Sequence, residues 1–163
     1  MIITNVSHTF VLEPSSAPIR NLVTKLGGQP AWLAEPHWPL SRQLGRPMKF
    51  LGQFQIPGEK LRLAYLFMTD DDEFVNGTWE PEGGENALIV QPGRVPGFVT
   101  TMAEAEGPSI CADVAVELMP ASKDLTDDVD ARLGGEPTWL QAEEYPSGGD
   151  WAFLFQLDYA TEH

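Results

Sequence analysis

Basic residues are scarce in this sequence. Ten Lys and Arg stand against 24 Asp and Glu, which gives a formal net charge of −14. Binding to nucleic acid or to an anionic membrane depends on clustered Lys and Arg that neutralise phosphates, so the composition argues against both kinds of partner. An acidic surface attracts basic proteins, although acidity also serves solubility alone. We therefore expect a basic protein partner, no nucleic acid and no membrane.

Cysteine is also scarce, and long apolar runs are missing. Cys111 is the one cysteine, which excludes an intramolecular disulfide and fits a reducing compartment. It lies in an expected strand with no basic neighbour, so we interpret it as a buried, unreactive thiol. No apolar run approaches about 18 residues, and residues 1–14 do not resemble a signal peptide. The sequence predicts a soluble cytoplasmic protein.

The residues of an enzyme or metal site are hard to find. Of the three histidines, only His37 stands in a loop beside a carboxylate, Glu35. Nucleophile-elbow, phosphate-loop and dinucleotide-binding motifs are missing. The acidic stretches 70–76 and 124–130 lack the spacing of a calcium loop, and we interpret them as solvated turns. We expect no cofactor, metal site or catalytic residue, and favour a protein that is not an enzyme.

Turn-forming residues, in contrast, are plentiful. Fourteen prolines and 15 glycines exclude long helices and leave short segments rich in aromatic and β-branched residues. The fold class we predict is mainly β, with α+β as the alternative: antiparallel sheets with short helices or turns. The length suits a single domain, 1–163. The expected strands are 2–12, 48–56, 61–68, 87–91, 110–118 and 151–159.

One phrase occurs twice. LGGQPAWLAEPHWP at 26–39 and LGGEPTWLQAEEYP at 133–146 agree at seven of fourteen positions. A strand with Phe-Leu-x-Gln follows each phrase, at 50–53 and 153–156. The order predicts a tandem-duplicated β unit, repeated at 20–70 and 127–160. The paired glycines supply positive φ, the proline fixes the chain direction and the tryptophan anchors the core.

The second copy also indicates which residues are structural. Gln53 and Gln156 stand mid-strand in the same setting, so we expect each amide to bond the backbone of an adjacent loop. The reactive position is not shared, because Glu144 stands where the first copy has His37. A binding site, if the fold has one, is expected in the groove where the two copies meet. The candidate binding residues are Trp32, Trp38, Gln53, Trp139, Tyr145 and Gln156.

These phrases carry a family resemblance. KLGGQPAWLAEPHWP, with the strand GRPMKFLGQFQIPG and the following LRLAYLFMTDDD, resembles the first unit of the YwqG-like family, a domain of unknown function. RLGGEPTWLQAEEYPSGGDWAFLFQLDY resembles its second unit. The phrase is also similar, more weakly, to the programmed cell death protein two group, which is implicated in chaperoning a basic ribosomal protein. That group's zinc-ribbon-like cysteines are missing here, so the resemblance implies no metal.

The resemblance implies further strands after the second unit, yet the sequence ends at His163. We therefore expect an open strand edge, suited to a homodimer or to another chain. Three functions are in competition. The first is a non-enzymatic, chaperone-like or immunity-like module that binds a basic protein. The second is a small-molecule binder or enzyme with a cleft between the repeats, and the third is a structural subunit that pairs through the open edge.

Overall fold

The computed structural model describes residues 6–71, 75–121, 131–139, 142–149 and 151–157. These residues form β-strands joined by turns and bends, and none of them is helical. The prediction of a mainly β, antiparallel fold is confirmed. Residues 19–26 contain bends and a two-residue strand, and residues 122–130 lie outside the described part of the chain. Within the described part of the chain, no helix is long and apolar enough to cross a membrane.

The chain divides into two compact units. Unit 1 comprises Met1–Leu12 and Glu117–His163, and unit 2 comprises Glu13–Val116. Each boundary falls inside a strand: the first in β1 (His8–Pro14) and the second in β8 (Val114–Pro120). The interpretation of the chain as a single domain stays a prediction.

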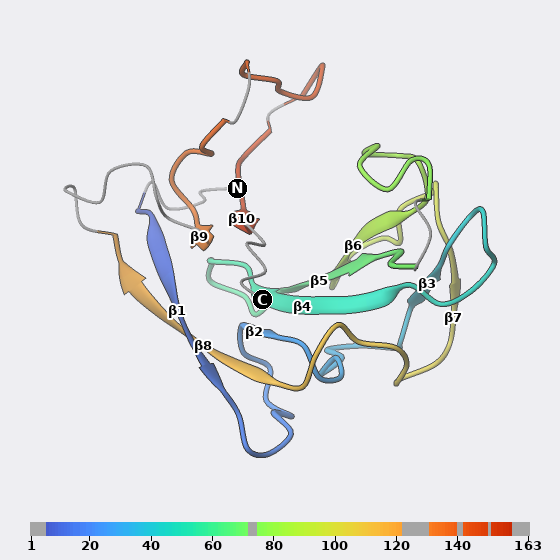
Figure 1. Cartoon of the computed structure of the whole chain (residues 1–163). Helices are drawn as coiled ribbons and strands as arrows, with labels where there is room; N and C mark the ends of the chain where they lie inside the picture. Colours follow the sequence, from blue (N-terminus) through green and yellow to red (C-terminus); the bar gives the residue numbers. More distant parts are fainter. Residues whose placement is uncertain (1–5, 72–74, 122–130, 140–141, 150, 158–163) are drawn as a thin grey trace. The chain divides into compact units, whose positions relative to one another are not determined.

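Unit 2 is built around a sheet with the strand order β8-β2-β4-β5-β6. The pairs are antiparallel, and β4, β5 and β6 lie side by side in Figure 1. The strands not yet given are β2 (Lys25–Leu26), β4 (Lys49–Gln55), β5 (Leu63–Met68) and β6 (Asn86–Gln91). A second, small sheet pairs β3 (Trp38–Leu40) with β7 (Thr100–Met102).

The core of unit 2 forms where the two sheets contribute aromatic side chains. Along β5, Leu63, Tyr65 and Phe67 stand at every second position, which turns them to the same face of the sheet. Phe50 of β4 stands opposite Phe67. A register shift between Phe50 and Gly52 interrupts the β4–β5 ladder. The fully buried cluster consists of Trp38, Met48, Phe50, Leu63, Tyr65, Phe67, Ala87 and Ile89. The predicted strands 48–56, 61–68 and 87–91 are thus confirmed.

Unit 1 has the strand order β10-β9-β1-β8. Antiparallel pairs join β9 (Ala131–Leu133) to β1 and to β10 (Phe155–Leu157). The strand predicted over 151–159 is shorter among the described residues, because 151–154 have no strand pairing and 158–159 lie outside the description. In the described part of unit 1, β10 stands at the end of the strand order.

Two expectations about particular residues need correction. The strand predicted over 110–118 begins only at Val114, so Cys111 lies in a bend. Cys111 is exposed, not buried. Partial desolvation, and secondarily the nearby Asp113 carboxylate, raise the pKa of its thiol, which favours the unreactive protonated form. The interpretation of the thiol as buried was wrong because the alternation of apolar residues starts later than the segment we assigned.

Candidate protein-binding surface

In the first copy of the repeated phrase the chain turns sharply at the end of β2, and we call this turn the first corner. Lys25 and Leu26 pair with Gln53 and Gly52 of β4. The chain then turns through Gly27, whose φ is 61°, and its N–H donates to the Leu51 carbonyl at 2.8 Å. A Cβ on this glycine would lie 2.3 Å from the Ala112 carbonyl oxygen. Glycine is required here for both its conformation and the close approach of the backbone.

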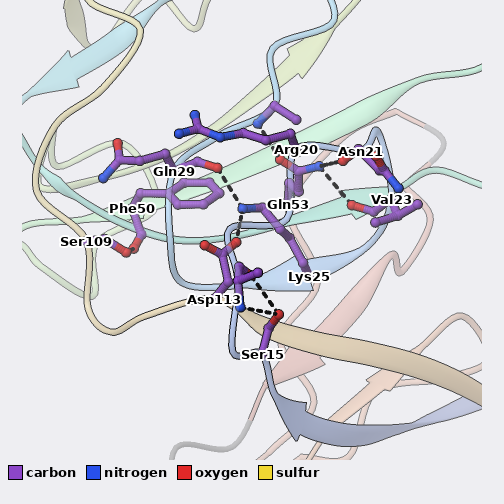
Figure 2. Close-up of polar contacts among 12 residues, drawn as sticks. Ser15, Arg20, Asn21, Val23, Lys25, Gln29, Phe50, Gln53, Ser109 and Asp113 are labelled. Atoms are coloured by element: carbon purple, nitrogen blue, oxygen red, sulfur yellow. Dashed lines mark hydrogen bonds and ion pairs between the residues drawn. The ribbon is translucent and has the colours of Figure 1, made fainter.

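Gln53 holds the loop that follows this corner. Its side chain is fully buried, and its Oε1 accepts the N–H of Ala31 at 2.8 Å. Its Nε2 donates to the carbonyls of Val23 at 2.8 Å and Asn21 at 3.3 Å (Figure 2). The amide therefore satisfies backbone groups that would otherwise be buried without partners. This is the structural role that the sequence predicts for it.

A buried charge also belongs to the first corner. Lys25 is fully buried, and its Nζ donates to the Asp113 carboxylate and, at 2.7 Å, to the Gln29 carbonyl (Figure 2). The Asp113 carbonyl in turn accepts the N–H of Ser15 at 2.9 Å. A buried ion pair contributes little net stability, but either partner left alone is costly. Sequence reasoning missed this pair because the two residues are distant in the chain.

The second copy forms an equivalent corner in unit 1. Leu133 and Arg132 pair with Phe155 and Gln156 of β10, in the same register as their counterparts in unit 2. The N–H of Gly134 donates to the Leu154 carbonyl at 2.8 Å, matching the bond from Gly27 to Leu51. Both glycines of the second copy have positive φ, 71° and 76°. The two phrases thus adopt the same local backbone pattern.

Gln156 repeats the role of Gln53. Its Oε1 accepts the N–H of Thr138 at 2.8 Å, and Thr138 is the counterpart of Ala31. Its Nε2 donates to the Thr138 carbonyl at 3.0 Å. The prediction that both glutamines bond an adjacent loop is confirmed.

The charged residue of the second corner lacks a comparable partner. Arg132 stands at the position of Lys25, and its Nη1 donates to the Glu136 carbonyl at 3.3 Å. Its buried Nε has no hydrogen-bond partner among the described residues. A Cβ on Gly28 would meet the Asp113 carboxylate, whereas a Cβ on Gly135 would meet Ser7. Ser7 therefore stands where the first corner has its carboxylate.

Beyond the corner, two further side chains of unit 2 form hydrogen bonds to the backbone of the same loop. Tyr65 of β5 donates its hydroxyl to the Ala31 carbonyl at 2.9 Å and accepts the N–H of Leu33 at 2.8 Å. Burial raises the pKa of Tyr65 to about 12, opposed in part by that bond from Leu33, so the hydroxyl remains a donor at neutral pH. Gln91 of β6 accepts the N–H groups of Leu33 and Ala34 at 3.1 and 2.9 Å. Three neighbouring strands thus each supply one polar side chain to the same loop.

The aromatic residues of the unit 2 loop are covered by β5. The ring of Trp32 lies 4.7 Å from that of Tyr65 and 6.1 Å from that of Phe67. Trp38 lies edge-on to Phe67 at 5.1 Å and is completely buried. Its Nε1 donates to the Met48 carbonyl at 2.8 Å. Trp38 and Gln53 are therefore parts of a closed core, and Trp32 packs half-buried against it.

In the unit 1 loop Tyr145 is exposed, whereas Trp139 is half-buried like its counterpart Trp32. Trp139 and Tyr145 lie edge-on at 5.1 Å, as Trp32 and Trp38 do at 6.4 Å. Tyr145 is 59% exposed and Trp151 is 63% exposed. These two, Trp139 and Phe153 are among the residues that line a cavity of about 390 Å³. We call these four residues the aromatic surface of unit 1.

The six predicted binding residues thus fall into two sets. Trp32, Trp38 and Gln53 lie in unit 2, where Trp38 and Gln53 are fully buried and Trp32 is half-buried against the core. The other three line the cavity of unit 1: Trp139, Tyr145 and Gln156. The binding groove expected between the copies stays a prediction. Trp151, which the hypothesis of a cleft between the repeats also placed in the wall of the pocket, lines the same cavity. It aligns with the buried Met48 and yet is the most exposed member of the aromatic surface.

The residues considered for catalysis or metal binding have ordinary surroundings. His37 is half-buried. Asp70 and Asp71 form ion pairs with Lys49 and Arg46. In the described part of the chain, no group of three or more His, Cys, Asp or Glu could hold a metal ion. The acidic stretch at 124–130 lies outside the described residues.

Comparisons with models of protein families, with curated proteins and with solved structures each find no match. The resemblance to the YwqG-like family and to the programmed cell death protein two group therefore stays a prediction.

Proposed function

We propose that this chain is a cytoplasmic, non-enzymatic protein-binding module that captures a basic protein partner, in the manner of a chaperone or an immunity protein. The observation that carries the proposal is the aromatic surface of unit 1. Tyr145 and Trp151 are more than half exposed, whereas their counterparts Trp38 and Met48 are 0% and 1% exposed. A group of exposed large apolar side chains is typical of a protein interaction site.

The charge around the aromatic surface favours a basic partner. Glu144 lines the same cavity, and Glu136 and Glu143 are exposed on the loop that carries it. The whole chain has a formal net charge of −14. Acidic groups at the rim speed the encounter with a cationic partner, while the aromatic rings supply the contact area for affinity. Binding of this kind is weakened by salt.

The proposal is tested by capture of proteins from a lysate on the immobilised full chain, at about 50 mM and about 500 mM NaCl. We expect a set of captured proteins that is basic and is reduced at the higher salt. Trp151→Ala should lose this set. Trp79→Ala is the matched control, because Trp79 is 79% exposed in unit 2, outside the aromatic surface. Capture that shows no preference for basic proteins, or equal capture by both variants, would contradict the proposal.

A small-molecule site in the same cavity is the second candidate. Its volume of about 390 Å³ falls in the range of ligand pockets, about 300–1,000 Å³. The amide of Gln156, expected to orient a ligand, is already bonded to Thr138 through both of its polar atoms. A ligand would therefore meet mainly aromatic rings and the Glu144 carboxylate. A thermal-shift screen with aromatic amines tests this candidate, and a response abolished by Tyr145→Ala would favour it.

A further inference from the structure

We infer that the cavity of unit 1 receives one arginine side chain of the basic partner, whose guanidinium lies against the aromatic rings and pairs with the Glu144 carboxylate. The inference rests on the proposed function and names the residue type by which the partner is held. Arginine is favoured by the charge of unit 1, by the lining of the cavity and by the flat groups that cover the equivalent tryptophan of unit 2.

The negative charge of this protein is concentrated in unit 1. Residues 1–12 and 117–163 contain eleven Asp and Glu and two Lys and Arg, whereas residues 13–116 contain thirteen Asp and Glu and eight Lys and Arg. Unit 1 therefore has a formal charge of −9, and the larger unit 2 has a formal charge of −5. A cationic partner is attracted to unit 1 more strongly than to unit 2.

The cavity of unit 1 combines aromatic rings with a negative charge. The aromatic surface supplies the rings of Trp139, Tyr145, Trp151 and Phe153. Among the described residues that line the cavity, Glu144 is the one that is charged. Both the faces of aromatic rings and a carboxylate attract cations, so this lining favours a cationic guest over a neutral or an anionic one.

The Glu144 carboxylate is available to a charged guest. Its side chain is exposed, and no ion pair among the described residues includes it. Two other polar groups of the lining are already engaged. Both polar atoms of Gln156 bond the Thr138 backbone. The Nε1 of Trp151 donates to the Gly148 carbonyl. A cation in the cavity therefore finds its ionic partner in Glu144.

Flat groups cover the counterpart of Trp139 in unit 2. This counterpart is Trp32, and the ring of Tyr65 lies 4.7 Å from it at an interplanar angle of 33°. The ring of Phe67 lies 6.1 Å from it at 16°. Among the described residues of unit 1, the ring beside Trp139 is that of Tyr145, which stands edge-on. Trp139 thus borders a cavity with no described ring stacked on it, and a planar guest group can stack there.

The guanidinium of arginine matches these features better than the ammonium of lysine does. It is planar, it is weakly hydrated and it stacks on aromatic faces. It also pairs with a carboxylate through two parallel N–H···O bonds, which an ammonium cannot form. Its other N–H groups remain hydrated, because the exposed Tyr145, Trp151 and Glu144 leave the cavity open to solvent. The guest is therefore an arginine within a basic segment.

The probe for this inference is the capped peptide Lys-Gly-Arg-Gly-Lys, compared with versions that carry lysine or citrulline in place of arginine. Citrulline keeps the planar shape of arginine and removes its charge. In calorimetry on the full chain at about 50 mM NaCl, the arginine peptide should bind at least roughly tenfold more tightly than the citrulline peptide. It should bind at least roughly fivefold more tightly than the lysine peptide.

Two adjacent glutamates provide a matched pair of variants. Glu143 and Glu144 are both exposed, and of the two Glu144 lines the cavity. Glu144→Gln should weaken binding of the arginine peptide at least roughly fivefold and leave binding of the citrulline peptide unchanged, because the lost interaction is an ion pair. Glu143→Gln removes the same charge and should weaken binding of the arginine peptide less than about twofold.

The rings are tested in the same way. Tyr145→Ala should weaken binding of the arginine peptide at least roughly tenfold. Trp79→Ala, which removes an exposed ring in unit 2, should bind the peptide as the wild type does. Equal binding by these two variants would overturn the inference.

The outcomes distinguish this inference from the proposed function. Equal binding of the arginine and lysine peptides, or equal losses in Glu143→Gln and Glu144→Gln, overturns the arginine site and leaves capture of basic proteins intact. Binding of the neutral peptide Ser-Gly-citrulline-Gly-Ser as tight as that of the arginine peptide overturns the basic partner itself. Tighter binding of a trimethyllysine peptide than of the arginine peptide assigns the cavity to a methylated ammonium group and also overturns the inference.

Discussion

The two corners of this protein are alike in backbone and opposite in exposure. In unit 2, Trp38 is fully buried, while its counterpart in unit 1, Tyr145, is 59% exposed. The corner motif therefore does not determine burial. In unit 2, β5 brings Tyr65 and Phe67 over the loop, and Trp38 itself stands in a strand that pairs with β7. The difference shows that the same local pattern serves as a core in one unit and as a binding surface in the other.

Truncating the aromatic partners should give the largest contrast between the units. Trp38→Ala opens a cavity among packed rings and should cost about 3–5 kcal/mol of unfolding free energy. Tyr145→Ala removes a ring that is more than half exposed and should cost less than about 1 kcal/mol. Urea unfolding followed by circular dichroism measures both. Similar losses for the two variants would mean that the aromatic surface of unit 1 is covered in solution.

The buried charged residue also differs between the two corners, because Lys25 has a carboxylate partner in Asp113 and the Nε of Arg132 has no partner among the described residues. Asp113→Ala leaves Lys25 buried without a counter-ion and should cost about 3–5 kcal/mol. Adding Lys25→Met should recover most of this loss, because the double variant buries no unpaired charge. Denaturant unfolding of the single and double variants checks the coupling. A single variant that loses less than about 1 kcal/mol would show that Lys25 reaches water.

The two glutamines test whether equal hydrogen bonds are equally important. Gln53→Leu leaves buried backbone groups of Ala31 and Val23 without their partner and should cost about 2–3 kcal/mol. Gln156→Leu frees the Thr138 backbone where water has access, and should cost about 1 kcal/mol. Unfolding free energies of the two variants give the ratio directly. An equal cost would contradict the view that the second corner is open.

The smallest expected effect appears at high pH. The pKa of Tyr65 is about 12 in the folded protein against an ordinary tyrosine value of 10.0, so the unfolded chain loses this proton first. The contribution of this proton to stability is full below about pH 10 and is lost as the pH rises toward about 12. Absorbance titration should show one phenol ionising late, and Tyr65→Phe should remove that late step. A variant with an unchanged late step would contradict the burial of Tyr65.

The parts of the fold that could be predicted from the sequence are those with a local cause. Alternation of apolar residues located β4, β5 and β6, and the repeated Leu-Gly-Gly-x-Pro phrase identified the glycines with positive φ. The position of Gln53 and Gln156 beside apolar neighbours was enough to predict their bonds to the loop. These signals are contained within a few consecutive residues.

The remaining features depend on residues that are distant in the chain. β2, β3 and β9 have two or three residues each, too few to show a period. The buried Glu85 was missed because its partners, Ser41, Gln43 and Thr69, come from other segments. The different burial of Trp151 and Met48 has a distant cause as well, since Met48 belongs to a buried cluster with residues of β5 and β6.

Amide hydrogen exchange at Ala31 and Thr138 tests most directly the claim that the first corner is closed and the second is open. The N–H groups of these two residues donate to Gln53 and Gln156 in the same way. The amide of Thr138 should exchange faster than that of Ala31, because Gln156 is half-buried whereas Gln53 is fully buried. Equal exchange at the two amides would contradict the claim.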